Sequence, residues 1–238
     1  MSNYAVIAAG QNFNIGTRVV LWNEPTGFSF YKNGKYIKRD KTIEKLQNEI
    51  NCFVLHHSVD YKAKNTYNNL RSRGLSVNFI IDDDATDGIA TIYQCLDIKD
   101  AGYSHKPLNL TGPGVEISYH PEAWEKPNLY SEKNRQKYKV SEHKTLKDTV
   151  HSQTRTVFAP TDAQVQACIA LAYGISQAFP NMKMEFPKNA NGEIIKTTVA
   201  DPKGLLCHFH ITKQKIDPAG FPCEYMEEQV KVWNKLGF

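Results

Sequence analysis

The sequence has few cysteines and no paired-cysteine motif. Its 238 residues include five cysteines, and no two of them stand in a CxxC arrangement. An odd count argues against a framework of disulfides, and the missing CxxC pairs exclude a four-cysteine zinc knuckle. At least one thiol is left over, which is typical of proteins from a reducing compartment.

Long hydrophobic runs are missing too. No run approaches the roughly 18 apolar residues that a membrane helix needs, and we expect no membrane partner. The apolar stretch at residues 5–10 is too short for the core of a signal peptide, and no basic segment precedes it. We therefore expect synthesis in the cytoplasm, with any export taking another route.

Nucleic-acid signatures are equally scarce. The sequence has no RNP-type aromatic motif, no helix-turn-helix pattern and no dense basic run, so we expect no nucleic-acid partner. The 29 basic and 25 acidic residues give a formal charge of +4, which permits an anionic partner and selects none. A content of 41% hydrophobic and 23% charged residues is typical of a globular chain and excludes a disordered one.

The order of apolar segments predicts one mixed α/β domain. β-rich runs predict strands, and a capping box formed by Thr161 and Gln164 precedes a run with helical periodicity. The expected strands are 51–58, 75–82, 91–97 and 114–119, and the expected helices are 42–50, 65–73, 161–179 and 224–236. With no repeat and no linker, we expect a mixed central sheet flanked by helices.

We divide residues 1–238, as a single domain, into four parts. Residues 1–50 form a β-rich N-terminal extension, with a hairpin expected at Asn33-Gly34. Residues 50–222 form the core, which contains a polar surface insertion at 120–160 that is partly helical at most. Residues 224–238 form a C-terminal helix.

Three histidine sites could carry chemistry. His56 and His57 end an apolar strand, where rigid backbone and an open tip favour functional groups. His105 stands in a loop, and His208 begins a segment that runs to Asp217. A catalytic zinc takes three protein ligands and leaves one place for water, and His56, His208 and Asp217 would supply three. The spacing alone also suits a hydrogen-bonded core histidine at position 56 and a turn at Asp217.

The ordered set of motifs resembles a known family. VLHHS, LSVNFIID, DG with IYQ, AGYSH, NLTGPGVEI and HFHITKQKIDP follow one another over about residues 50–222. This order is similar to that of the zinc-dependent N-acetylmuramoyl-L-alanine amidases of the amidase-2 type, which are related to peptidoglycan recognition proteins and to phage endolysins. The resemblance implies their mixed α/β fold, one Zn²⁺ per chain and bacterial peptidoglycan or muropeptide as partner.

The resemblance also implies roles for individual residues. The family's first motif places a zinc ligand at His56, with His57 as the neighbouring alternative. Its last motif implies His208 and Asp217 as the other ligands, with His210 competing for the place of His208. Cys207 and Cys223 lie close in sequence to this loop, where either could ligate or modulate the metal or be a small buried hydrophobe.

Three further residues are the implied catalytic groups. Glu116 would take a proton from the attacking water and pass it to the leaving amine, and Lys215 would stabilise the developing oxyanion. His105 would position the substrate or hydrogen-bond the tetrahedral intermediate. The family often has Tyr or His in the strand that here holds Val77 and Asn78, so Glu116 must carry the base role.

Two competing classes of protein and two biological roles of an amidase remain at this point. A non-catalytic binding module would lack one of the metal ligands, whereas this chain retains His, His and Asp. Another metal-dependent peptidase with the standard zinc site on a helix would need the motif HExxH, which is absent. A lytic amidase would act on the intact cell wall, reached through a holin or other export. A recycling amidase would act in the cytoplasm on soluble anhydro-muropeptides.

Overall fold

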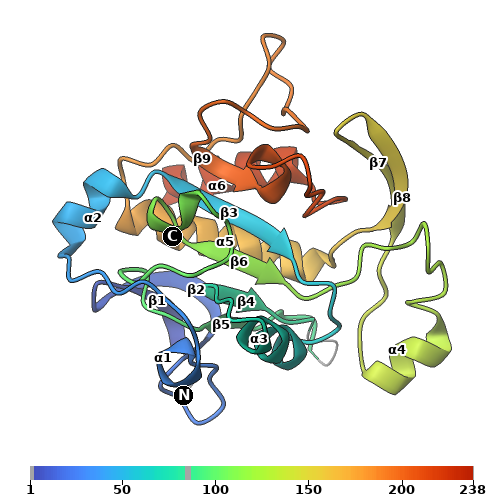
Figure 1. Cartoon of the computed structure of the whole chain (residues 1–238), viewed down its shortest axis with the longest axis horizontal. Helices are drawn as coiled ribbons and strands as arrows, with labels where there is room; N and C mark the ends of the chain where they lie inside the picture. Colours follow the sequence, from blue (N-terminus) through green and yellow to red (C-terminus); the bar gives the residue numbers. More distant parts are fainter. Residues whose placement is uncertain (1–2, 84–86, 238) are drawn as a thin grey trace.

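A mixed sheet of seven strands forms the centre of the molecule, shown in Figure 1. The computed structural model describes residues 3–83 and 87–237. The sheet order is β1-β2-β5-β4-β6-β3-β9. The strands are β1 (Asn3–Ala8), β2 (Gln11–Leu21), β3 (Cys52–His57), β4 (Phe79–Ile81), β5 (Ile92–Gln94), β6 (Gly114–Ile117) and β9 (Gly204–Cys207).

Helices cover both faces of this sheet. One face packs on α5 (Asp162–Ala178), which in turn contacts α6 (Cys223–Leu236), and the other carries α1 (Phe30–Asn33) and α3 (Ala63–Ser72). The remaining helices are α2 (Ile43–Glu49), α4 (Glu132–Tyr138) and the 3₁₀ turns η1 (Leu108–Leu110) and η2 (His208–His210). This arrangement confirms the predicted mixed sheet flanked by helices.

The best-predicted helix is α5. Gln164 N–H donates to Thr161 Oγ1 at 3.2 Å, and Thr161 N–H donates to the Gln164 side-chain oxygen at 3.1 Å, so the predicted capping box is confirmed. Behind this cap the helix is buried on nearly all sides. Each large apolar side chain removed from water in this way contributes about 1.5–3 kcal/mol.

Two predictions about irregular regions are wrong. Asn33-Gly34 forms no hairpin: Phe30 is buried in the core beneath α3, the chain makes one helical turn there, and Gly34 has an extended φ of −129°. The insertion 120–160 contains a two-stranded hairpin, β7 (Thr145–Val150) with β8 (Gln153–Phe158). Its turn is His151-Ser152, both with positive φ, so the usual Asn-Gly signal was absent.

The predicted extension 1–50 contributes to the central sheet, because β2 pairs in parallel with β5. Residue 238, which ends the predicted C-terminal segment, lies outside the described residues. Among the described residues, no helix is both long and apolar enough to cross a membrane.

Candidate metal centre and active-site cleft

The candidate site lies where three parallel strands end. β3 runs between β6 and β9, with His56 opposite Glu116 and Leu55 opposite Cys207. The arrows of β3 and β6 point toward the side of the molecule that carries α4 and the β7–β8 hairpin (Figure 1). Adjacent parallel strands therefore bring their C-terminal residues to one edge of the sheet.

Strand alternation decides which side chains meet at this edge. Cys52 and Val54 pack with Leu206 in a small cluster separate from the core that contains α5. Successive side chains of a strand point to opposite faces. His56 is therefore on the face opposite α5, and its register partner Glu116 shares that face.

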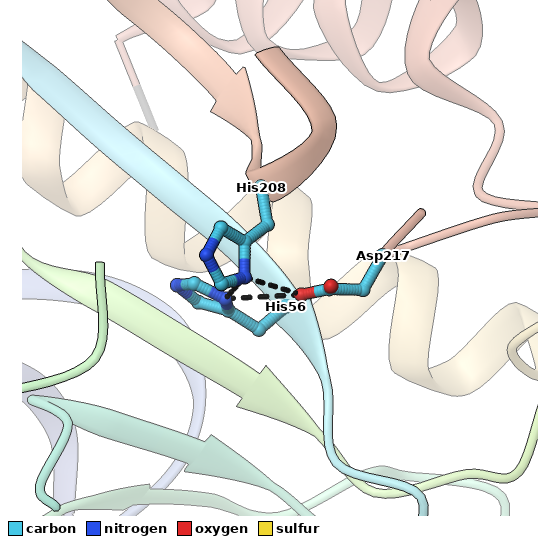
Figure 2. Close-up of side chains that lie close together, drawn as sticks. All are labelled: His56, His208 and Asp217. Atoms are coloured by element: carbon cyan, nitrogen blue, oxygen red, sulfur yellow. Dashed lines mark hydrogen bonds and ion pairs between the residues drawn. The ribbon is translucent and has the colours of Figure 1, made fainter. Parts of the chain in front are cut away.

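Three atoms that could bind a metal ion converge there, as Figure 2 shows. The Nδ1 atoms of His56 and His208 lie 3.0 Å apart. Asp217 Oδ2 lies 3.1 Å from His56 Nδ1 and 2.9 Å from His208 Nδ1. All three residues are buried. The structure thus brings together, in the interior, the three residues predicted as ligands.

The size and chemistry of this triangle fit a divalent metal ion. Ligand bonds of about 2.0–2.1 Å in tetrahedral zinc sites imply ligand–ligand separations of about 3.3 Å, slightly longer than those here. Two imidazoles and one carboxylate are ligands that zinc accepts in catalytic sites. A cation among these three electron-rich atoms would be held by His56, His208 and Asp217.

Protonation also favours metal binding. Burial and the neighbouring His208 lower the pKa of His56 to about 4, so its imidazole is neutral at pH 7. Burial raises the pKa of Asp217, but hydrogen bonds from His208 and His56 outweigh it and hold this pKa well below the usual value. A neutral imidazole and an ionised carboxylate are the forms that bind metals.

Glu116 lies beside this cluster with part of its carboxyl group unpaired. Its side chain is 8% exposed, it lines the same cleft, and its Oε2 has no hydrogen-bond partner among the described residues. Burial raises the pKa of Glu116 well above its ordinary value, and the charge of Asp217 adds to the rise. Lys215 and Arg73 oppose it. A buried carboxyl group without a partner is costly, which marks it as a candidate functional group.

Lys215 is exposed and lines the cleft on the loop that leads to Asp217. The β7–β8 hairpin holds this loop in place. His151 Nε2 donates to Lys215 O at 2.9 Å, and Asp148 Oδ2 accepts from Gly220 N–H at 2.7 Å. Asp148 is buried, and its second oxygen pairs with Lys196 at 2.6 Å. The sequence prediction missed this support because it missed the hairpin.

His105 lies behind His56 and is not part of the cleft wall. The two rings stack with centroids 5.6 Å apart, and His105 is 1% exposed. Its Nδ1 contacts Ser104 Oγ at 2.7 Å and its Nε2 contacts Gly112 O at 3.2 Å. The predicted contact of His105 with substrate stays a prediction.

The alternative ligands lie apart from the triangle. His210 uses both ring nitrogens, one accepting from Cys207 N–H at 2.9 Å and one donating to Ile195 O at 2.6 Å. His57 is on the α5 face of its strand, its ring lies 5.6 Å from the Tyr119 ring, and neither of its nitrogens is hydrogen-bonded among the described residues. The buried sulfur atoms of Cys207 and Cys223 are 3.6 Å from each other. Neither thiol belongs to the group of possible metal ligands found among the described residues.

The cleft has a volume of about 310 Å³. Besides the predicted residues, its lining includes Asn69 from α3, Arg73 directly after α3 and Trp124 from the insertion. Sequence reasoning missed these three because each comes from a segment that carries no motif. Only the folded chain shows that α3 and the start of the insertion flank the ends of β3 and β6.

Comparisons with solved structures place this fold. No protein-family profile matches the chain, and no curated protein matches its sequence. The endolysin N-acetylmuramoyl-L-alanine amidase LysCS from Clostridium intestinale is similar, with 14% identity, a TM-score of 0.50, and 90% of this chain and 95% of that one covered. The N-acetylmuramoyl-L-alanine amidase LysC from Clostridium intestinale is also similar. It has 15% identity and a TM-score of 0.50, with 90% of this chain and 97% of that one covered.

A third similar structure is AmpDH3 from Pseudomonas aeruginosa, at 14% identity and a TM-score of 0.50, covering 80% of this chain and 68% of that one. At these identities the likeness concerns the fold. The chain has the fold of the N-acetylmuramoyl-L-alanine amidases.

Proposed function

We propose that the chain is a zinc-dependent amidase that hydrolyses the bond between N-acetylmuramic acid and L-alanine in peptidoglycan. One observation carries this proposal: His56, His208 and Asp217 converge within 3.1 Å, beside the unpaired Glu116, in an open cleft. The amidase fold supports the same reaction class.

The three buried ligands would hold the metal ion on one side of the cleft. When bound, zinc supplies a Lewis acid that polarises a carbonyl and lowers the pKa of a water molecule toward about 7. His56 stands at the end of β3, and His208 directly follows the neighbouring strand β9. Asp217 stands on the loop that the hairpin holds.

Glu116 serves as the proton carrier. Its Oε2 is buried and unpaired, so it can accept the proton of the attacking water and return it to the amine of L-alanine. Its raised pKa suits a group that must hold a proton between these two steps. The positive charges of Lys215 and Arg73 favour the ionised form of Glu116, which is the form that accepts a proton.

Lys215 supplies positive charge at the cleft. Its backbone carbonyl is fixed by His151, which limits where the side chain can reach. From this position the ammonium group can stabilise the oxyanion that forms when water attacks the amide carbon. A preorganised cation of this kind contributes most where water is partly excluded.

We further propose that the substrate is the intact wall, so that the enzyme is lytic like an endolysin or autolysin. Residues 126–144, with six Lys or Arg and two Glu, favour a polymeric, anionic surface over a small soluble muropeptide. The recycling role remains the alternative. A binding module without catalysis is disfavoured because none of the three ligand side chains has been replaced.

The test is hydrolysis of purified sacculi with the products identified. Amidase action releases peptides with a free N-terminal alanine and leaves the lactyl carboxylate on the glycan, with no new reducing sugar. We expect one zinc per chain by elemental analysis and peptides of these masses. New reducing ends, or peptides that begin at another residue, would overturn the assignment. Faster cleavage of soluble anhydro-muropeptide than of sacculi would favour recycling.

A further inference from the structure

The positive charge of the chain is concentrated in one segment of the insertion. Residues 126–144 contain six Lys or Arg and two Glu, so this segment alone carries a formal charge of +4. The whole chain also carries +4, which leaves 23 basic and 23 acidic residues to balance one another elsewhere. We call residues 126–144 the basic segment. It includes α4, which projects from the body of the molecule in Figure 1.

The fold holds this segment rigidly. Tyr130 and Val140 of the segment are buried with Ala123 and Phe158 in a cluster that is separate from the main core. His143 adds a polar anchor, with its Nδ1 2.7 Å from Ala159 O and its Nε2 3.4 Å from Asp83 Oδ2. α4 itself buries no residue, so its side chains are presented to solvent on an ordered support. A charged run without a role has no need of such an anchor.

Three of the six cations have no counter-ion. Lys133, Lys137 and Lys139 are exposed, and within residues 3–83 and 87–237 no ion pair joins them to an acidic group. The other three pair as Lys126–Glu122 at 2.8 Å, Arg135–Glu142 at 3.7 Å and Lys144–Asp162 at 4.0 Å. The three lysines are thus available to an anion from outside the chain.

The basic segment continues the wall of the cleft. Tyr138, at the end of α4, stacks on Tyr61 with ring centroids 4.5 Å apart, and the preceding residue Asp60 lines the cleft. Lys126 pairs with Glu122, which lines the cleft from the other side. A polymer that contacts the three lysines would therefore lie near residues that line the cleft.

We propose that the basic segment binds an anionic phosphodiester glycopolymer of the bacterial wall and so places the cleft on the peptidoglycan to which that polymer is attached. This inference rests on the proposed function for the identity of the wall. Spaced lysines on an ordered support suit repeated phosphates, which attract them without a fixed register. The ring of Tyr138 is stacked on Tyr61. We therefore expect the segment to recognise the polymer by the charge of its phosphates.

The test measures co-sedimentation of the full chain with wall fragments on ice. One set of walls carries the phosphodiester polymer, and a second set has lost it by acid treatment. We compare the native chain with a variant that combines Lys133→Glu, Lys137→Glu and Lys139→Glu. The matched control combines Lys32→Glu, Lys45→Glu and Lys235→Glu, three exposed residues on α1, α2 and α6. Both variants change the net charge equally.

At 100 mM salt we expect the first variant to bind polymer-bearing walls at least about tenfold more weakly than the native chain. The control should change less than about twofold, because charges farther away than the Debye length of about 10 Å are screened. Equal losses in both variants, equal binding to stripped walls, or stronger competition by DNA than by free polymer would each overturn the proposal. Circular dichroism and thermal melting verify the fold.

Hydrolysis of a soluble muropeptide separates this inference from the proposed function. The lysines lie outside the catalytic groups, so the rate of muropeptide hydrolysis should stay within about twofold of native in both variants. Normal hydrolysis with no loss of wall binding would overturn the role of the basic segment and leave the amidase standing. Polymer-dependent binding with no hydrolysis by the native chain would overturn the amidase alone.

Discussion

Two buried sites in this molecule place histidine against aspartate, and they differ in what is left unsatisfied. In the first, His56 and His208 meet Asp217 in the candidate metal centre. In the second, His143 meets Asp83 beneath the basic segment, with Nε2 3.4 Å from Asp83 Oδ2. Burial is similar, since His56, His143 and Asp83 are all at most 5% exposed.

The hydrogen bonds separate the two sites. His143 Nδ1 donates to Ala159 O at 2.7 Å, and Asp83 Oδ2 also accepts from Ser141 N–H at 2.8 Å, so each group has a protein partner. In the candidate metal centre two Nδ1 atoms face each other across 3.0 Å, and His56 Nε2 has no partner among the described residues. The His143–Asp83 pair anchors a segment, whereas the convergence of two imidazole nitrogens on one carboxylate oxygen is an arrangement that could hold a metal ion.

The largest expected effect comes from His208→Ala. If His208 is one of three zinc ligands, its removal should abolish stoichiometric zinc and reduce amide hydrolysis at least about 1,000-fold, because a bound metal would supply both water activation and carbonyl polarisation. Zinc per chain by elemental analysis, together with release of N-terminal alanine, measures this. The control is His143→Phe, which should keep its zinc. If His208→Ala keeps one zinc per chain, the ligand assignment is wrong.

Glu116→Gln tests the unpaired carboxyl group beside the ligands. The amide keeps the size of the side chain and cannot accept the proton, so hydrolysis should fall at least about 100-fold. Zinc content should remain near one per chain because Glu116 is outside the ligand triangle. Near-native hydrolysis at unchanged zinc would remove Glu116 from the mechanism.

Asp148→Asn tests the support of the ligand-bearing loop. The substitution weakens the contacts to Gly220 N–H and Lys196 and leaves the three ligands in place. We expect zinc affinity to fall about 10-fold, in the range found for groups that orient ligands. Competition with a fluorescent chelator measures the affinity directly. Unchanged affinity with a lowered melting temperature would show that the hairpin supports stability alone.

Much of the fold was predictable because it depends on local signals. The capping box at Thr161 and the apolar run that becomes β3 each specify an element without distant information. The β7–β8 hairpin was not predictable in this way. Its strands are polar on the outer face, and its turn places His151 and Ser152 at positive φ, which sequence rules assign to Asn and Gly.

The residues of the candidate site were likewise predictable only in part. His56, His208 and Asp217 follow from the motif order, and the structure places them within 3.1 Å of one another. His105 lies in a motif too, yet hydrogen bonds to Ser104 and Gly112 O occupy both of its nitrogens. Whether a histidine is satisfied depends on groups brought near it by folding, which no spacing in the sequence records.

Asp83→Asn should have the smallest effect on metal and catalysis, and it completes the comparison. Burial raises the pKa of Asp83, but hydrogen bonds from His143 and Ser141 outweigh it and hold this pKa below 3.8. A carboxylate with a depressed pKa stabilises the fold above its unfolded pKa, and this stabilisation is lost as pH falls through the folded value.

The variant should therefore lose about 1–3 kcal/mol of unfolding free energy at pH 7. It should also show less acid destabilisation than the native chain below about pH 4. Urea unfolding at pH 7 and pH 3 measures both effects, and the folded variant should have the same zinc content as the native chain at pH 7. Loss of zinc in Asp83→Asn would mean that the two sites are coupled, and their contrast would then no longer separate an anchoring pair from a metal-binding one.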